Sequence, residues 1–153
     1  MKKTLMFTAL MLALSAAFAQ NRTLSISDYV VSDVLVEMLS PAKVEQMRSE
    51  DPVTLITMNR TLAAYCAVVD KLWEEDFVQM GYLEDYLPKG MTYSEEDIIA
   101  AGSVNPYKWK LPQDETRYNL FKLRKDGLYV VVMPKVELDL RVEAQLRQYG
   151  LSK

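Results

Sequence analysis

The sequence predicts a small α+β domain with a helical N-terminal layer, an irregular aromatic-rich middle, and a C-terminal β-hairpin followed by a terminal helix. Three observations support this class. Apolar residues recur at helical spacing through the first half of the chain. An Asp-Gly pair separates two β-prone runs near the end. Between them, a segment rich in tyrosine, proline and glycine follows neither period. Helices followed by strands are typical of α+β domains.

The N-terminus carries an export signal. Lys2 and Lys3 precede the apolar run LMFTALMLAL, and Ala17-Phe18-Ala19 fits an A-x-A cleavage site. The apolar run is shorter than the ~20 residues that a membrane span needs. We therefore expect residues 1–19 to be a cleaved signal peptide and residues 20–153 to form a single domain. The pattern is typical of bacterial export to the periplasm or the extracellular space.

The charge balance argues against two classes of partner. The whole chain has 18 basic and 21 acidic residues, and residues 1–19 hold two lysines and no acid, so the mature charge is 16 − 21 = −5. Nucleic acids select dense Lys/Arg surfaces, and anionic membranes select basic amphipathic helices. We therefore expect no nucleic-acid binding. We also expect no membrane span in the mature chain, because no stretch after residue 19 is long and apolar enough.

Capping patterns predict the helices of the N-terminal layer. Ser25 and Asp28 have the spacing of a capping box. Ser40 followed by Pro41 predicts a short helix that ends near Ser49. The first helix would use an apolar stripe behind its capping box, formed by Val31, Val34, Leu35, Met38 and Leu39.

A long central helix is predicted from Asp51-Pro52 to about residue 77. Ala63 and Trp73 widen its apolar surface beyond a narrow seam, as in the central helix of a globular core. The seam is shorter than the roughly three to four heptads of a sustained coiled coil. It consists of Leu55, Met58, Leu62, Tyr65, Val69 and Leu72.

Cys66 is the only cysteine, and it falls inside this predicted helix. One cysteine cannot form a disulfide within the chain, and the absence of histidine excludes a Cys–His pair. We interpret Cys66 as a small buried hydrophobic residue. An intermolecular bridge or a redox role is the alternative.

Missing residues and motifs exclude several chemistries. Without histidine there is no Ser–His–Asp or Cys–His hydrolase site, and the usual zinc ligands are too few. The sequence has no phosphate-binding glycine loop and no EF-hand pattern. We expect no metal and no cofactor. Paired carboxylates could still hydrolyse a glycosidic bond, although adjacent acids are more often solvated. The acidic clusters are Glu74–Asp76, Glu84–Asp85, Glu95–Asp97 and Asp114–Glu115.

The middle of the chain, residues 81–118, contains six aromatic residues among turn signals. Ser94 and Asp97 cap a short helix there that Gly102 ends. The aromatic side chains either pin a long irregular segment onto the core or bind a partner, because Tyr and Trp supply amphipathic contact area.

Two aromatic residues in the motif NPYKWK are the main binding candidates. Lys108 and Lys110 alternate with Tyr107 and Trp109, so an extended backbone would place both rings on one side. We expect both rings to be at least partly exposed. The predicted partner-binding residues are Tyr107, Trp109, Tyr93 and Tyr86.

The C-terminal part predicts a hairpin and a helix. Residues 117–124 and 128–133 flank Lys125-Asp126-Gly127, and Asp-Gly between β-prone runs is a strong hairpin signal. The continuous run YVVV is typical of a strand covered on both faces. Charged pairs at i,i+4 and a Gly150 stop predict a helix from about residue 140 to 149. Residues 135–139 fit a strand or a helix.

These observations favour an exported, non-enzymatic protein-binding protein, an accessory subunit of a bacterial envelope or secreted assembly. The aromatic middle supports this hypothesis, and so does a hairpin edge that could pair with a partner strand. The alternative is a small carboxylate-dependent hydrolase or a carbohydrate-binding module. The sequence does not indicate an oligomeric state.

Overall fold

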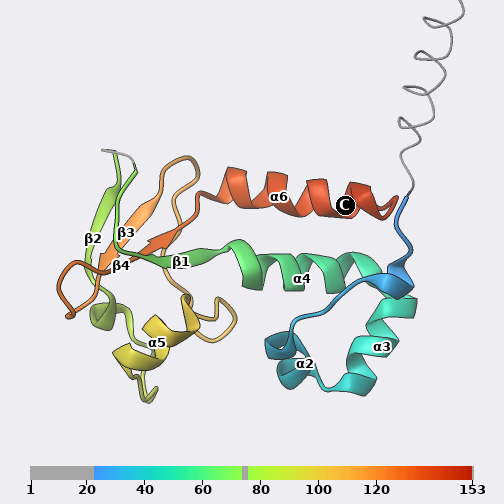
Figure 1. The fold of residues 1–153 in the computed structure, drawn as a ribbon, viewed down its shortest axis with the longest axis horizontal. Coiled ribbons are helices and arrows are strands. Elements are labelled where there is room, and N and C mark those ends of the chain that lie inside the picture. The colour runs from blue at the N-terminus through green and yellow to red at the C-terminus, as the bar shows by residue number, and fades with distance from the viewer. Residues whose placement is uncertain (1–22, 74–75, 153) are drawn as a thin grey trace, which may run out of the picture.

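The computed structural model describes residues 23–73 and 76–152. The predicted signal peptide lies outside the described residues. The predicted α+β class is confirmed, because helices combine with a four-stranded sheet (Figure 1). No helix in the described part of the chain has the length and apolar character needed to cross a bilayer.

Two predicted helix starts in the N-terminal layer are confirmed. Ser40 accepts the backbone N–H of Lys43 at the start of α3 (Pro41–Glu50), and Asp51 caps α4 (Pro52–Ala64). The first helix was predicted too early. Ser25 caps only a 3-10 turn, η1 (Ile26–Asp28), and α2 (Asp33–Leu39) begins behind Ser32.

The predicted long helix to residue 77 is wrong, because α4 ends at Ala64 and strand β1 (Cys66–Val69) follows at once. Val68 and Val69 pair with Val130 and Tyr129 of strand β4 (Tyr129–Val132). β-Branched residues fit a pleated surface well. Pairing with a distant strand therefore outweighs a helical spacing that continues through this segment.

The predicted hairpin is confirmed. Strands β3 (Asn119–Lys122) and β4 are antiparallel, and the turn uses Gly127 at φ +78°. The sheet order is β1-β4-β3-β2, with β2 (Val78–Tyr82) parallel to β3. Both edges of the hairpin are therefore occupied by other strands, so the expected free hairpin edge is not available to a partner.

The C-terminal helix α6 spans Lys135–Gln148. Residues 135–139, for which the sequence fitted a strand or a helix, are therefore helical. The predicted glycine stop is present as a Schellman motif, with Leu151 N–H donating to Leu146 O and Gly150 N–H to Arg147 O, both at 3.0 Å. Helices α4 and α6 lie side by side and continue the antiparallel β1–β4 pair (Figure 1). At the junction, Met133 N–H donates to Tyr65 O at 2.9 Å.

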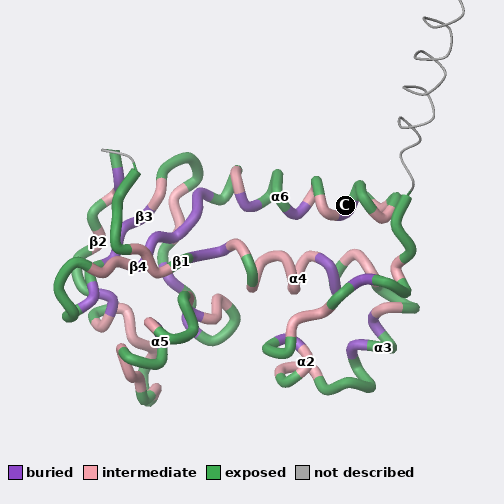
Figure 2. The backbone as a smooth tube through the Cα atoms, in the orientation of Figure 1, coloured by how far each residue is buried: buried purple, intermediate pink, exposed green. Residues whose placement is uncertain are grey.

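The buried side chains form two main clusters at opposite ends of the molecule, and Figure 2 marks buried residues at both ends. We call the part built from α2, α3, α4 and α6 the helical region, and the part built from the strands and α5 the sheet region. Buried residues of the helical region include Leu35, Val44, Leu55, Ile56, Val142 and Leu146. Those of the sheet region include Leu83, Ile98, Trp109, Phe121, Val130 and Val132.

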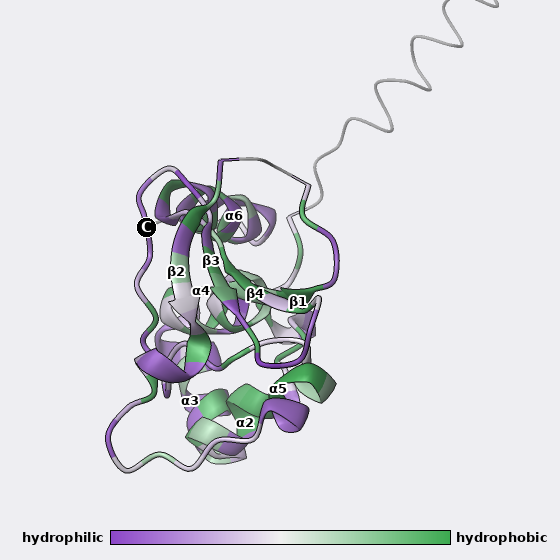
Figure 3. Cartoon of the chain, turned by 90° about the vertical axis from the view of Figure 1, so that its left-hand side faces the viewer, coloured by the Kyte–Doolittle hydropathy of each residue, from purple (hydrophilic) through white to green (hydrophobic). Residues whose placement is uncertain are grey.

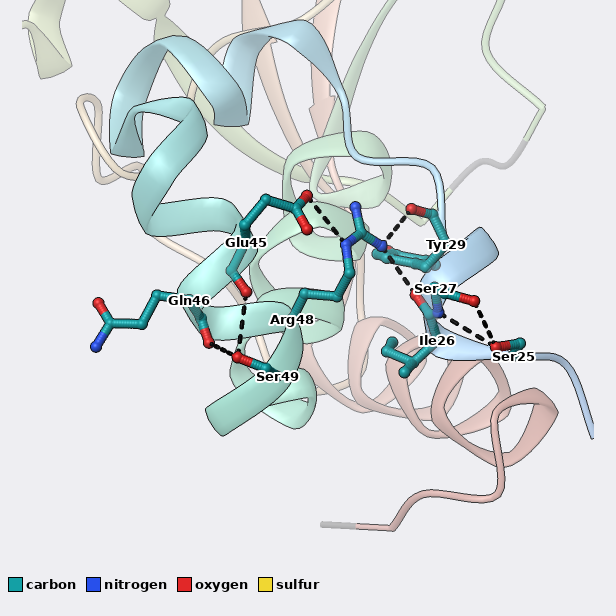
Figure 4. A network of polar contacts seen from close by, with 8 residues as sticks. All are labelled: Ser25, Ile26, Ser27, Tyr29, Glu45, Gln46, Arg48 and Ser49. Atoms are coloured by element: carbon teal, nitrogen blue, oxygen red, sulfur yellow. Dashed lines mark hydrogen bonds and ion pairs between the residues drawn. The ribbon is translucent and has the colours of Figure 1, made fainter.

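Arg48 fastens the N-terminal segment to the helical region (Figure 4). Its guanidinium donates to the backbone oxygens of Ile26 and Tyr29, both at 2.8 Å, and forms an ion pair with Glu45. Carbonyl groups outside regular structure need such donors when they are partly buried. The contact explains how an irregular segment is held against α3.

One face of the sheet is covered by the irregular middle, which contains η2 (Leu83–Tyr86) and α5 (Glu95–Ala101). Ser94 caps α5, and Gly102, at φ +70°, ends it as predicted. On the opposite face, Phe77 packs on Leu120 and Val131. Phe77 belongs to the connection between β1 and β2, which we call the crossover, because these two strands lie at opposite edges of the sheet (Figure 3) and run in the same direction.

Candidate protein-binding surface

Three of the four predicted binding residues form one internal cluster. The rings of Tyr93 and Trp109 meet edge-to-face at 5.4 Å, and the indole N–H of Trp109 donates to the Tyr86 carbonyl oxygen at 2.8 Å. The Tyr86 ring packs on Phe121 at 5.1 Å, and its hydroxyl donates to Met80 O at 3.0 Å. These contacts attach the irregular middle to the sheet.

The predicted exposure of Trp109 is wrong, because only 4% of this residue is exposed. The backbone of NPYKWK is a turn, not an extended segment. Trp109 N–H donates to Asn105 O at 2.8 Å, and Tyr107 N–H donates to the Asn105 side-chain oxygen at 2.9 Å. The turn sends the indole into the core and leaves Tyr107 outside, at 38% exposure.

A hollow of about 230 Å³ lies beside Tyr93 and Trp109. Asp97 and Lys108 are the charged residues in its lining. Its volume is below the roughly 300–1,000 Å³ of most small-molecule sites. We therefore do not place the functional site here.

The acidic clusters of the described residues serve as structural contacts. Glu95 accepts the backbone N–H groups of Arg124 and Lys125, which fastens α5 to the hairpin turn. A hydrogen bond from Arg124 lowers the pKa of Glu84, and backbone N–H groups of Thr116 and Arg117 lower the pKa of Asp114. Carboxyl groups held ionised in this way are poor general acids. Glu74 and Glu75 lie outside the described residues.

Cys66 is buried in β1 and not in a helix. Its Sγ lies 3.3 Å from the backbone N of Val104 and 3.5 Å from Val104 O. Burial raises the pKa of the thiol to about 11. A thiol that is mostly protonated at neutral pH is a weak nucleophile, which agrees with the interpretation of Cys66 as a packing residue.

The crossover leaves an apolar surface on the other face of the sheet. Trp73, which the long-helix prediction placed in the core, is 54% exposed. Its ring contacts Phe77 and Tyr118 edge-to-face, each at 5.5 Å. A crossover between parallel strands usually needs about a dozen residues and often a helix. In the shorter connection here, Phe77 packs on Leu120 and Val131, and Trp73 stays exposed.

The surface continues onto α6. Tyr118 lines two hollows. Trp73 also lines the first, of about 170 Å³, and Val136 and Leu140 also line the second, of about 430 Å³. Val136 and Leu140 are 49% and 60% exposed. We call this set the crossover surface: Trp73, Tyr118, Val136 and Leu140.

A polar chain crosses the middle of the crossover surface. The Tyr118 hydroxyl donates to Glu137, which also accepts from Arg141 at 2.7 Å. The hydrogen bond from Tyr118, followed by that from Arg141, lowers the pKa of Glu137. The contacts fix Tyr118 relative to α6, so the aromatic and aliphatic parts of the surface have a defined arrangement.

Sequence reasoning missed the crossover surface because it predicted one long helix from Pro52 to about residue 77, which includes Trp73. A usable signal was present: Val68 and Val69 are β-branched, and Asp70 follows them. Within the described residues, no three acidic or cysteine side chains form a group that could hold a metal ion.

Comparison with protein-family models, with curated proteins and with solved structures finds no significant match to this chain. The residues and their geometry alone carry the functional argument.

Proposed function

We propose that this chain is an exported, non-enzymatic protein-binding protein, an accessory subunit of a bacterial envelope or secreted assembly, and that it binds through the crossover surface. The observation that carries the proposal is the gathering of exposed Trp73, Val136 and Leu140 around Tyr118. Exposed apolar residues that gather at one place and are rimmed by polar ones mark contact sites more often than scattered ones do; here the rim includes Asp76, Arg117 and Glu137.

The composition of the surface fits a protein partner. Trp, Tyr and Arg are enriched where single residues contribute most to binding, and Trp73, Tyr118 and Arg141 lie together here. Tyr118 and Arg141 are already held by hydrogen bonds to Glu137. Side chains ordered before binding lose less conformational entropy when a partner docks.

Photo-crosslinking in the producing cell tests this function. A photoreactive residue at position 73 or 140 should form discrete adducts, and the same residue in place of Val30, which is 82% exposed, should not. The Trp73→Ala/Leu140→Asp double variant, with a crosslinker at Val136, should lose the adducts and keep its melting temperature. Adducts of equal strength from position 30 would contradict the proposal.

Export is tested separately, by mass spectrometry of the mature N-terminus. The proposal expects the exported protein to begin at Gln20, after Ala17-Phe18-Ala19. An N-terminus at Met1 in the cytoplasmic fraction would contradict it. This experiment does not depend on the identity of the partner.

A further inference from the structure

The hollow of about 230 Å³ beside Tyr93 and Trp109 has an acid and a base at its mouth. Asp97, on α5, and Lys108, in the turn that follows Asn105, line the hollow and are exposed. Among the described residues, neither side chain takes part in an ion pair or a hydrogen bond. The carboxylate and the ammonium group are therefore not paired with each other.

Other acids and bases that meet across elements of this fold are paired. Arg124 of the hairpin turn pairs with Glu84 of η2, and Arg117 pairs with Asp76 at 3.8 Å. Asp97 and Lys108 line the same hollow without closing it. They present an anionic acceptor and a cationic donor to a molecule that enters the hollow.

Behind the two charges, the lining is apolar and held in place. Ile98, Val104 and Trp109 are buried. The Trp109 ring contacts Tyr93 edge-to-face at 5.4 Å, and its N–H donates to Tyr86 O at 2.8 Å. The hollow thus combines a charged mouth with a fixed apolar inner wall, as small-molecule sites do.

We propose that this hollow binds a free α-amino acid with an apolar side chain. The ammonium group of the ligand donates to Asp97, its carboxylate accepts from Lys108, and its side chain packs on the apolar inner wall. A ligand with a single charge leaves one of the two charged residues unmatched, whereas a zwitterion pairs with both.

The volume restricts the ligand to a small molecule. The hollow is smaller than the roughly 300–1,000 Å³ of most ligand pockets, which hold drug-sized molecules. The inference goes beyond the proposed function, because the hollow lies on the irregular middle and the crossover surface lies on the opposite face of the sheet. The experiments on this hollow therefore do not depend on a protein partner.

Isothermal titration calorimetry on the chain from residue 20 tests the site. The probes are L-leucine, L-leucinamide, which lacks the carboxylate, and 4-methylpentanoate, which lacks the amine. We expect L-leucine to bind with a dissociation constant in the micromolar to millimolar range, because a ligand of this size makes few contacts. Each truncated probe should bind at least about tenfold more weakly, since it loses one charge-assisted contact.

Two neutral variants assign the charges. Asp97→Asn should weaken L-leucine binding at least about tenfold and leave 4-methylpentanoate binding unchanged, because that probe has no amine to lose. Lys108→Gln should weaken L-leucine binding equally and leave L-leucinamide binding unchanged. The matched controls Glu96→Gln and Lys110→Gln change exposed neighbours that do not line the hollow, and they should keep the wild-type affinity.

Nuclear magnetic resonance locates the ligand. L-leucine should shift the indole N–H resonance of Trp109, which lines the hollow, and not that of Trp73, which lies on the crossover surface. Thermal melts check that each variant is folded. The inference is overturned if none of L-leucine, L-valine and L-phenylalanine binds at millimolar concentration, or if either truncated probe binds as well as L-leucine. A shift of the Trp73 resonance alone also overturns it.

Discussion

The helical region and the sheet region are stabilised by contacts of different range. In the helical region, Ser32, Ser40 and Asp51 each cap a helix through a backbone N–H three residues ahead. In the sheet region, Cys66 pairs with Val132, and each strand finds its partner far along the chain or across a turn. The first region therefore depends on local signals, and the second on pairing that exists only in the folded state.

The two regions are nevertheless joined by continuous chain. Helix α4 runs into β1, and β4 runs through Met133 and Pro134 into α6. The antiparallel pair of helices and the antiparallel pair of strands share these two connections. We therefore expect one cooperative unfolding transition, in spite of two hydrophobic clusters.

The largest effects should come from truncation in either cluster. Phe121→Ala, in the sheet region, should lower the free energy of unfolding by about 4 kcal/mol, and Leu55→Ala, in the helical region, by about 3 kcal/mol, because both residues are fully buried. Denaturant unfolding followed by circular dichroism and by tryptophan fluorescence measures both. Transitions that separate between the probes would contradict a single cooperative unit.

The next largest effect is the difference between Trp109 and Tyr107 in the stability lost when each is replaced by alanine. Trp109→Ala should cost about 3–5 kcal/mol, because the indole is buried and its N–H is bonded to Tyr86 O. Tyr107→Ala should cost about 1 kcal/mol, because the residue is partly exposed and its hydroxyl shares a hydrogen bond with Thr61. Thermal melts of the two single variants measure the contrast. Equal losses would mean that the turn at Asn105 does not separate the two rings.

A pH effect is expected at the junction of the two regions. Burial raises the pKa of Tyr65 from 10.0 to about 12 and that of Cys66 from 9.0 to about 11. The unfolded chain therefore ionises first. The stability that these groups contribute is complete below pH 9 and is lost as the pH rises toward 12.

Urea midpoints measured from pH 8 to pH 12 test this expectation. Tyr65→Phe should be less stable at pH 8, since it lacks the 2.7 Å hydrogen bond to Leu111 O, and should lose less on going to pH 12. Cys66→Ala isolates the contribution of the thiol between pH 9 and pH 11. If the urea midpoints of the wild type and of Tyr65→Phe fall in parallel with pH, then Tyr65 has the same pKa in the folded and unfolded states.

The smallest effects should come from matched caps. Ser32→Ala at α2 and Ser94→Ala at α5 should each lower the free energy of unfolding by about 1 kcal/mol, because each hydroxyl accepts one backbone N–H. Amide hydrogen exchange should show local opening of α2 in the first variant and of α5 in the second. Protection lost over the whole chain would mean that these caps act globally.

The sequence by itself determined the features that depend on neighbours in the chain. Ser40-Pro41 and Asp51-Pro52 set two helix starts, Asp126-Gly127 set the hairpin, and Gly150 set the end of α6. Each works within one turn, through a backbone conformation or a hydrogen bond that nearby residues supply. Such features were predictable for that reason.

The tertiary structure decided where α4 ends, which aromatic residues are buried, and where the candidate site lies. The spacing of residues 55–72 fits a helix, but pairing of Cys66–Val69 with β4 satisfies the backbone groups of this segment and buries Cys66. That gain depends on residues sixty or more positions away, and no local pattern contains it. Trp73 is exposed because α4 ends before it and the chain continues into β1 and the crossover, and Trp109 is buried because its segment turns at Asn105.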